Sequence, residues 1–174
     1  MLGHSLGGAL GSALVCSGLL PREHVGPVTV IGVGAPPAIF DAADGGAASG
    51  PLLREPTAVT ARFLLVVNGS DVVPRLLGSP LPFVMASALE EKVASGARAE
   101  SMRATIESLQ RYAHPEQTEL LLLREGRALA VPREQRPAVL HVHEAIGLSL
   151  AKDHKADLYV AALEQVLADR AAAR

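Results

Sequence analysis

The chain begins Met1-Leu2-Gly3-His4-Ser5-Leu6-Gly7-Gly8, and this stretch decides how the rest is interpreted. Gly3-x-Ser5-x-Gly7 is the spacing of a nucleophile elbow, a tight turn between a strand and a helix. We expect glycines two positions either side of Ser5 because the backbone is too crowded there for a Cβ atom. The turn would hold the Ser5 hydroxyl above a sheet edge, where the Leu6 amide could donate to an oxyanion.

The composition predicts one soluble domain. The chain has 174 residues, 49% of them hydrophobic, and a formal net charge of −2. That length suffices for a single buried core, and the charge gives no reason to expect nucleic-acid binding. No segment is apolar for long enough to span a bilayer, so we expect a cytoplasmic protein without a transmembrane segment. Cys16 is the only cysteine, which excludes an internal disulfide and predicts a small buried residue.

Strand and helix patterns alternate along the chain and predict an α/β fold with a mostly parallel sheet and flanking helices. The segment 27–33 is apolar on both faces, which is typical of an interior parallel strand. Residues 41–56 have the composition of a surface loop. The other expected elements are a helix at 6–20 ended by Pro21, a strand at 61–67, a helical pair at 82–112, a hairpin of strands 118–123 and 128–131, and a helix at 155–171.

Two details of these elements are also predicted. The last helix should present one apolar face, formed by Tyr159, Leu163, Val166 and Leu167, with Asp153 as its N-cap. Only Met1 and Leu2 precede Gly3, so we expect the strand that presents Ser5, and the strands before it, to be missing. Residues 1–174 are therefore interpreted as the C-terminal portion of a larger catalytic domain, with a helical insertion at 82–112.

A serine nucleophile needs a base, and the base needs an acid that fixes its tautomer. Asp71 follows the strand at 61–67, where polar groups of an open α/β sheet collect. Its alternative role is to close an Asx-turn. His154 precedes the last helix and is the preferred base, with His143 and His114 as alternatives. The order Ser5, Asp71, His154 is the order of an α/β-hydrolase.

The remaining histidines have non-catalytic interpretations, and His143 has such an interpretation in addition to its place as an alternative base. His4 lies within the elbow and is expected to point away from the position that Ser5 faces, so that it either packs or contacts a residue of the site from behind. His24 is expected in solvent. His141 and His143 alternate as on one face of a strand, and no third ligand has a convincing spacing, so no metal site is predicted.

Four segments of the chain resemble a known family. They are Gly3–Leu10, Ile31–Pro36, Val66–Leu76, and Asp153-His154 followed by a helix containing Tyr159. These segments are similar to the elbow, the "FGxP" strand end, the "VVNxxDxVPRL" acid segment and the "DH…Y" base segment of the fungal-type class 3 lipases, in particular their diacylglycerol-lipase-like members. Ala35-Pro36-Pro37 departs from the family's usual loop after the strand.

The resemblance implies an α/β-hydrolase that cleaves acyl esters of glycerolipids through an acyl-serine, without a cofactor. It implies Ser5 as nucleophile, His154 as base and then acid, Asp71 as its orienter, and the Leu6 amide as an oxyanion donor. The implied partners are a glycerolipid or other acyl ester and, transiently, a lipid surface. The family's lid and second oxyanion donor lie upstream of the elbow, so a non-catalytic remnant or interaction module is the alternative. Acyl transfer and thioester hydrolysis would use the same triad.

Overall fold

A computed structural model describes the two ends and the central strands of the chain. The described residues are 1–18, 20, 26–40, 60–69, 71–76, 100–101, 105, 112–115, 117–140 and 154–172. The predicted loop at 41–56, the N-cap Asp153, and His24, His141 and His143 lie outside them, as does most of the predicted helical pair. Within that pair, Glu100, Ser101 and Thr105 are helical, as predicted, whereas Tyr112, the last residue of the predicted pair, lies in a strand.

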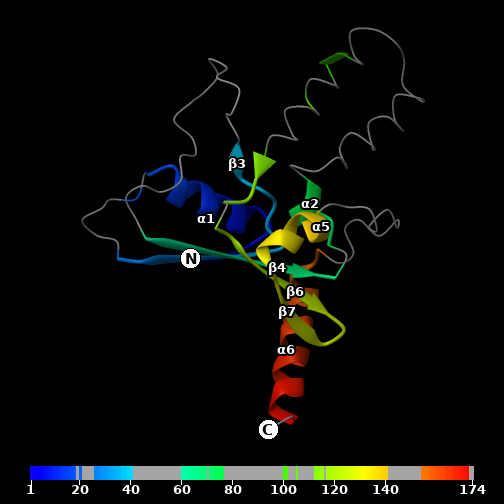
Figure 1. The fold of residues 1–174 in the computed structure, drawn as a ribbon. Helices are drawn as coiled ribbons and strands as arrows, with labels where there is room; N and C mark the ends of the chain where they lie inside the picture. The colour runs from blue at the N-terminus through cyan, green and yellow to red at the C-terminus, as the bar shows by residue number, and fades with distance from the viewer. Residues whose placement is uncertain are drawn as a thin grey trace.

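The main element is a mostly parallel sheet of five strands in the order β1-β2-β4-β6-β7 (Figure 1). Its strands are β1 (Leu2–His4), β2 (Val28–Val33), β4 (Ala61–Asn68), β6 (Glu119–Arg124) and β7 (Arg127–Val131). The first four run parallel, and β7 returns antiparallel to β6. A separate antiparallel pair joins β3 (Ile39–Phe40) to β5 (Tyr112–Ala113).

Helices flank both faces of the sheet. Alternate strand residues point to opposite sides, so each face carries apolar side chains that pack against a helix. Val15 and Cys16 of α1 (Leu6–Cys16) pack on one face against Val30 and Phe63. Farther along that face, residues of α5 (Arg136–Leu140) pack against β4, β6 and β7. Helix α6 (Ala156–Ala172) packs on the opposite face, against β4 and β6. The short helices α2 (Val73–Leu76) and η2 (Arg133–Gln135) complete the described elements.

The strand predictions are largely confirmed. Strand β2 is interior, with β1 and β4 as parallel neighbours, and its residues pack on both faces. The β6–β7 hairpin turns at Glu125 and Gly126, whose φ angles of 51° and 70° suit a tight hairpin turn. The expectation that no strand leads into Ser5 is wrong, because Leu2–His4 form β1 and pair with Ile31–Val33. That strand is short and lies at the sheet's edge.

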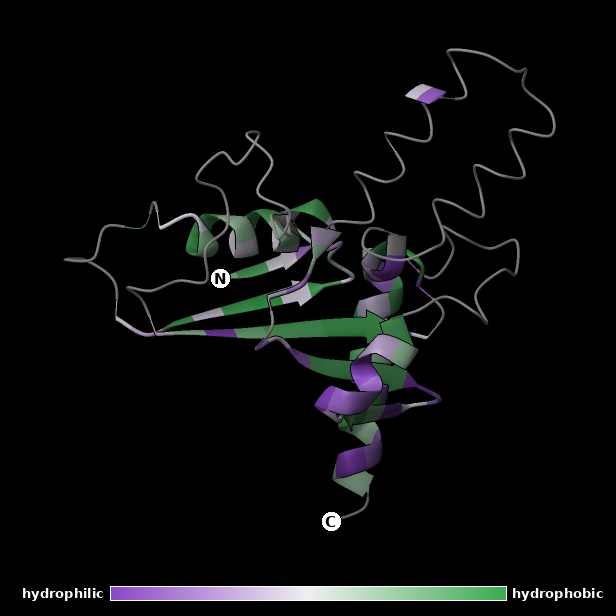
Figure 2. Cartoon of the chain, turned by 45° about the horizontal axis from the view of Figure 1, so that its top comes forward, coloured by the Kyte–Doolittle hydropathy of each residue, from purple (hydrophilic) through white to green (hydrophobic). Residues whose placement is uncertain are grey.

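Two helix predictions need correction. Helix α1 ends at Cys16, before Pro21, and Gly18 has a left-handed φ of 69°. Tyr159 and Val166 of α6 are buried, but Leu167 is 66% exposed and does not belong to the packed face. Leu167 is eight residues from Tyr159, which turns it about 80° around the helix axis. Figure 2 shows α1 and the central strands as mainly hydrophobic, while α6 carries many hydrophilic positions.

The described helices give no sign of a membrane crossing. None of them combines the length and the apolar character that such a crossing needs.

Candidate active site

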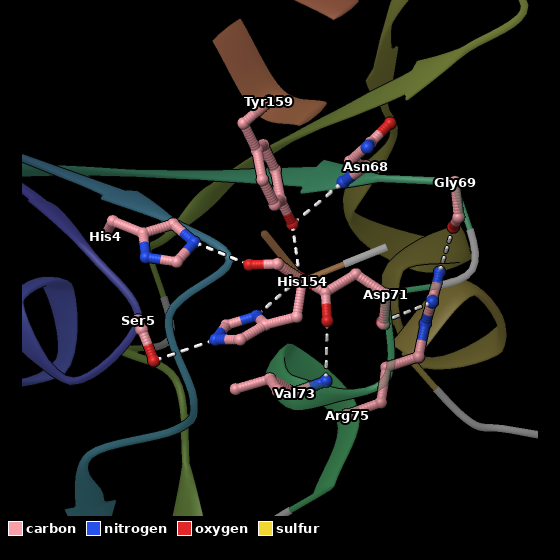
Figure 3. Close-up of polar contacts among 9 residues, drawn as sticks. All are labelled: His4, Ser5, Asn68, Gly69, Asp71, Val73, Arg75, His154 and Tyr159. Carbon is pink, nitrogen blue, oxygen red and sulfur yellow. Dashed lines mark hydrogen bonds and ion pairs between the residues drawn. The ribbon is translucent and has the colours of Figure 1, made fainter. Parts of the chain in front are cut away.

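The structure brings Ser5, His154 and Asp71 together at the carboxyl ends of the parallel strands, from three distant parts of the chain. His154 Nε2 lies 2.8 Å from Ser5 Oγ, and His154 Nδ1 lies 3.0 Å from Asp71 Oδ2 (Figure 3). Asp71 as a carboxylate can only accept, so Nδ1 carries the hydrogen and Nε2 accepts from the Ser5 hydroxyl. The three groups therefore form one directed hydrogen-bond chain.

Ser5 has the backbone of a strained turn. Its φ is 54° and its ψ is −129°, between the end of β1 and the start of α1. Positive φ is costly for a residue with a side chain and persists only where the surroundings enforce it. Here the Ser5 amide donates to the Val33 carbonyl at 2.9 Å, while the Ser5 carbonyl accepts from the amides of Gly8 and Ala9. The strand and the helix thus fix the hydroxyl in the direction of His154.

The glycines of the elbow differ from each other in their roles. A Cβ atom on Gly3 would lie 2.4 Å from the Gly7 carbonyl carbon, so the predicted crowding is real at that position. A Cβ atom on Gly7 would meet nothing within 4 Å, so the same prediction is wrong there. Gly8 is the second crowded position, because its Cβ would lie 2.7 Å from the Ala35 Cβ. The close approach of α1 to β1 and β2 requires Gly3 and Gly8.

Asp71 is completely buried, with 0% of its surface exposed. Its Oδ1 accepts from the Val73 amide at 2.9 Å, which is the Asx-turn proposed as its alternative role. Its Oδ2 accepts from His154 and also from the Tyr159 hydroxyl, at 2.5 Å. The two oxygens therefore make the contacts that the two interpretations require, because Oδ1 closes the Asx-turn and Oδ2 contacts His154.

Tyr159 of α6 is the site residue whose polar role the sequence did not predict. Its hydroxyl donates to Asp71 and accepts from the Asn68 amide at 3.0 Å. Burial raises the pKa of Tyr159, and the hydrogen bond to Asp71 raises it further, so the phenol stays protonated as a donor. The signal available in the sequence is that a tyrosine on an apolar helix face needs a partner for its hydroxyl.

Arg75 of α2 supports the loop that carries Asp71. Its guanidinium donates to the backbone carbonyls of Asp71 at 2.6 Å, Gly69 at 3.1 Å and Val139 at 2.9 Å. Burial lowers the pKa of Arg75, and the nearby Asp71 charge opposes that change. The arginine therefore ties the turn after β4 to α5 and keeps the backbone of Asp71 in place.

The other described histidines, His4 and His114, contact backbone oxygens and not the Ser5 hydroxyl. His4 Nε2 lies 2.8 Å from the backbone oxygen of His154, so His4 does not point away from the site, and its contact with a site residue agrees with the second of its two expected roles. His114 Nε2–H donates to the Pro74 carbonyl at 3.1 Å, and burial lowers the pKa of His114 to about 4. The alternative base His143 lies outside the described residues. Among the described histidines, His154 is the one whose ring contacts Ser5.

In the part of the chain that the structure describes, no group of three or more His, Cys, Asp or Glu side chains is arranged so that it could hold a metal ion. Comparison of the chain with family models, with curated proteins and with solved structures gives no match in any of the three. The geometry of the site is therefore the main basis on which a function can be inferred.

Proposed function

We propose that this chain is a serine hydrolase of the α/β-hydrolase type that cleaves carboxylic acyl esters through an acyl-serine. The observation that carries the proposal is the continuous hydrogen-bond chain from Ser5 through His154 to the buried Asp71. A hydroxyl, an imidazole and a carboxylate in this order are the parts of a nucleophile, its base and the group that orients the base.

The fold supports the α/β-hydrolase assignment. Ser5 follows a parallel strand and begins a helix, as the nucleophile of that fold does. Asp71 follows the parallel strand β4, and His154 comes last, before α6. The chain order serine, acid, histidine distinguishes this fold from other serine hydrolases with the same three groups.

The proposed reaction proceeds in two halves. In the first, Ser5 Oγ attacks the ester carbonyl carbon while His154 Nε2 takes the hydroxyl proton. The imidazolium then gives that proton to the departing alcohol, which leaves an acyl-serine. In the second half, His154 takes a proton from water, the hydroxide attacks the acyl carbon, and the proton returns to Ser5 Oγ as the acid leaves. Asp71 holds the imidazole in the required tautomer throughout.

The start of α1 supports a role for the Leu6 amide in binding the oxyanion. Leu6 is the first residue of the helix, and first-turn amides have no partner within a helix. Within the described backbone hydrogen bonds, the amides of Gly8 and Ala9 are paired with Ser5, whereas that of Leu6 is not paired. A donor aimed at the developing negative charge contributes about 10²- to 10³-fold in rate.

Glycerolipid esters are the proposed substrate class. The resemblance to class 3 lipases supports this choice, and so does the apolar surface beside the nucleophile. Leu6 is 63% exposed and Leu10 is 60% exposed, one turn apart on a helix that carries no charged residue. Such a surface suits an acyl chain and transient contact with a lipid surface.

A fluorophosphonate probe tests this proposal, because it phosphonylates only an activated serine. We expect the wild-type chain to be labelled and Ser5→Ala to be unlabelled. Ser12→Ala is the matched control, since Ser12 lies on the same helix with its hydroxyl bonded to the Gly8 carbonyl, and it should be labelled like the wild type. A folded wild-type chain without labelling would favour the non-catalytic alternative. Turnover of oxygen esters and thioesters of several chain lengths then separates a lipase or esterase from a thioesterase.

A further inference from the structure

His4 makes two separate contacts with the proposed base. Its Nε2 lies 2.8 Å from the backbone oxygen of His154, 150 residues away in the chain. A carbonyl oxygen can only accept a hydrogen bond, so His4 Nε2 carries the hydrogen and donates it. The His4 ring also lies against the His154 ring, with centroids 4.8 Å apart and planes 30° apart. Figure 3 shows His4 and Ser5 on the same side of His154, each contacting a different part of it.

The backbone of His4 is a firm anchor for these contacts. His4 is the last residue of β1 and pairs with Val33 of β2. Its ring also contacts the Tyr159 ring edge-on, at a centroid distance of 5.8 Å. His4 therefore links three parts of the site: the strand that carries Ser5, the turn that carries His154, and the helix that carries Tyr159.

We propose that His4 is a positioning residue that holds His154 in line with Ser5, through its hydrogen bond to the His154 backbone and its contact with the His154 ring. This inference rests on the proposed function. The bonds from Ser5 and Asp71 fix the two nitrogens of the His154 ring, but neither holds its backbone. The His4 bond supplies that restraint from the residue next to the nucleophile, so base and nucleophile share one rigid support.

The expected effect follows from the geometry of the reaction. A displacement of about 1 Å between reacting groups can cost about 10²-fold in rate. Loss of the His4 contacts should therefore lower kcat and the phosphonylation rate by about ten- to a hundredfold. KM should change little, because the described contacts of the His4 side chain are with His154 and Tyr159.

Three variants separate the two contacts. His4→Phe keeps a ring and loses the donor, His4→Gln keeps a donor at a similar reach and loses the ring, and His4→Ala loses both. We expect His4→Ala to be slowest, His4→Phe to be slow, and His4→Gln to recover much of the rate. Val15→Ala is the control for stability, because Val15 is buried in the core against β2 and β4 and away from the triad. It should unfold more easily and keep its kcat.

The second readout is the proton between His154 Nδ1 and Asp71, observed by NMR in the free protein. We expect its low-field resonance in the wild type, and a shifted or broadened resonance in His4→Phe and His4→Ala. A His4→Phe variant with the wild-type phosphonylation rate and an unchanged resonance would overturn the inference. If the wild type itself is not labelled, the proposed function fails, while the resonance still decides whether His4 positions His154.

Discussion

The two ends of the triad are built in opposite ways. Asp71 is 0% exposed and lies beside the buried Tyr159 and Arg75, whereas Leu2 and Leu6, on either side of the elbow, are 75% and 63% exposed. The acid end is held by side chains that pack and donate hydrogen bonds. The serine end is held by backbone, through one short edge strand and the first turn of a helix.

Because of this difference, substitutions at one end should act on both stability and activity, and substitutions at the other end on activity alone. A buried carboxylate is tolerated only when hydrogen bonds satisfy it, and Asp71 accepts from Val73, Tyr159 and His154. Substitutions around Asp71 should therefore cost stability and activity together. Substitution of the Ser5 hydroxyl, whose hydrogen-bond partner among the described residues is His154, should remove activity and leave stability nearly unchanged.

The largest expected effect at the acid end comes from Gly34→Ala. Gly34 has a φ of 58°, and a Cβ there would lie 2.8 Å from Asp71 Oδ2 and 3.0 Å from the Tyr159 hydroxyl. The left-handed backbone alone costs a residue with a side chain about 1–2 kcal/mol, and displacement of Asp71 adds to that. We expect a large loss of phosphonylation rate with a lower free energy of unfolding, measured by urea titration.

Gly18→Ala is the matched control for that substitution. Gly18 has a φ of 69° with nothing within 4 Å of its Cβ position, so it incurs the backbone cost without the collision. It should be destabilised by about 1–2 kcal/mol and keep the wild-type rate. Equal losses of rate in both variants would show that the collision of a Cβ atom at position 34 with Asp71 does not lower the phosphonylation rate.

Tyr159→Phe should have a smaller effect at the same end. It removes one donor from Asp71 and leaves the partly buried Asn68 amide without its acceptor. We expect a loss of about 1–3 kcal/mol in unfolding free energy and about a two- to tenfold lower kcat. Val166→Ala, on the same buried face of α6, should cost similar stability without a change in kcat. A Tyr159→Phe variant as stable and as fast as the wild type would contradict the role given to this hydroxyl.

The smallest effect concerns His114, which donates a hydrogen bond to the carbonyl of Pro74, three residues after Asp71. Burial lowers the pKa of His114 from 6.5 to about 4. Between these two pH values, His114 is therefore protonated in the unfolded chain and neutral in the folded chain. The stability contribution of the neutral histidine is therefore lost as pH falls from 6.5 toward 4, by about 1–2 kcal/mol at pH 5. Urea unfolding at pH 7 and pH 5 should show that loss in the wild type and a smaller one in His114→Asn. Equal pH dependence in both proteins would exclude His114 as its source.

The sequence predicts the parts of the site that depend on local chemistry. The elbow spacing, the position of Asp71 after a strand and the position of His154 before a helix each follow from a few neighbouring residues. The structure links those three side chains by two hydrogen bonds, one from Ser5 to His154 and one from His154 to Asp71. The interior position of β2 and the β6–β7 hairpin likewise follow from apolar patterning and turn chemistry.

The remaining features depend on contacts between distant segments, which spacing does not reveal. The crowding at Gly3 and the open space at Gly7 look alike in the motif and differ only because of how α1 meets the sheet. The Tyr159–Asp71 bond joins residues 88 positions apart. Leu167 follows the apolar pattern of α6 but is 66% exposed, because it is turned about 80° around the helix axis from Tyr159.

A double-mutant cycle decides whether Ser5, His154 and Asp71 act as one unit. The measurement is the rate of fluorophosphonate labelling at Ser5 in the wild type, His154→Ala, Asp71→Asn and the double variant. If Asp71 acts only through His154, each single variant should lose about 10³-fold or more, and the double variant should be no slower than His154→Ala. Losses that multiply in the double variant, or a His154→Ala variant labelled as fast as the wild type, would contradict the account.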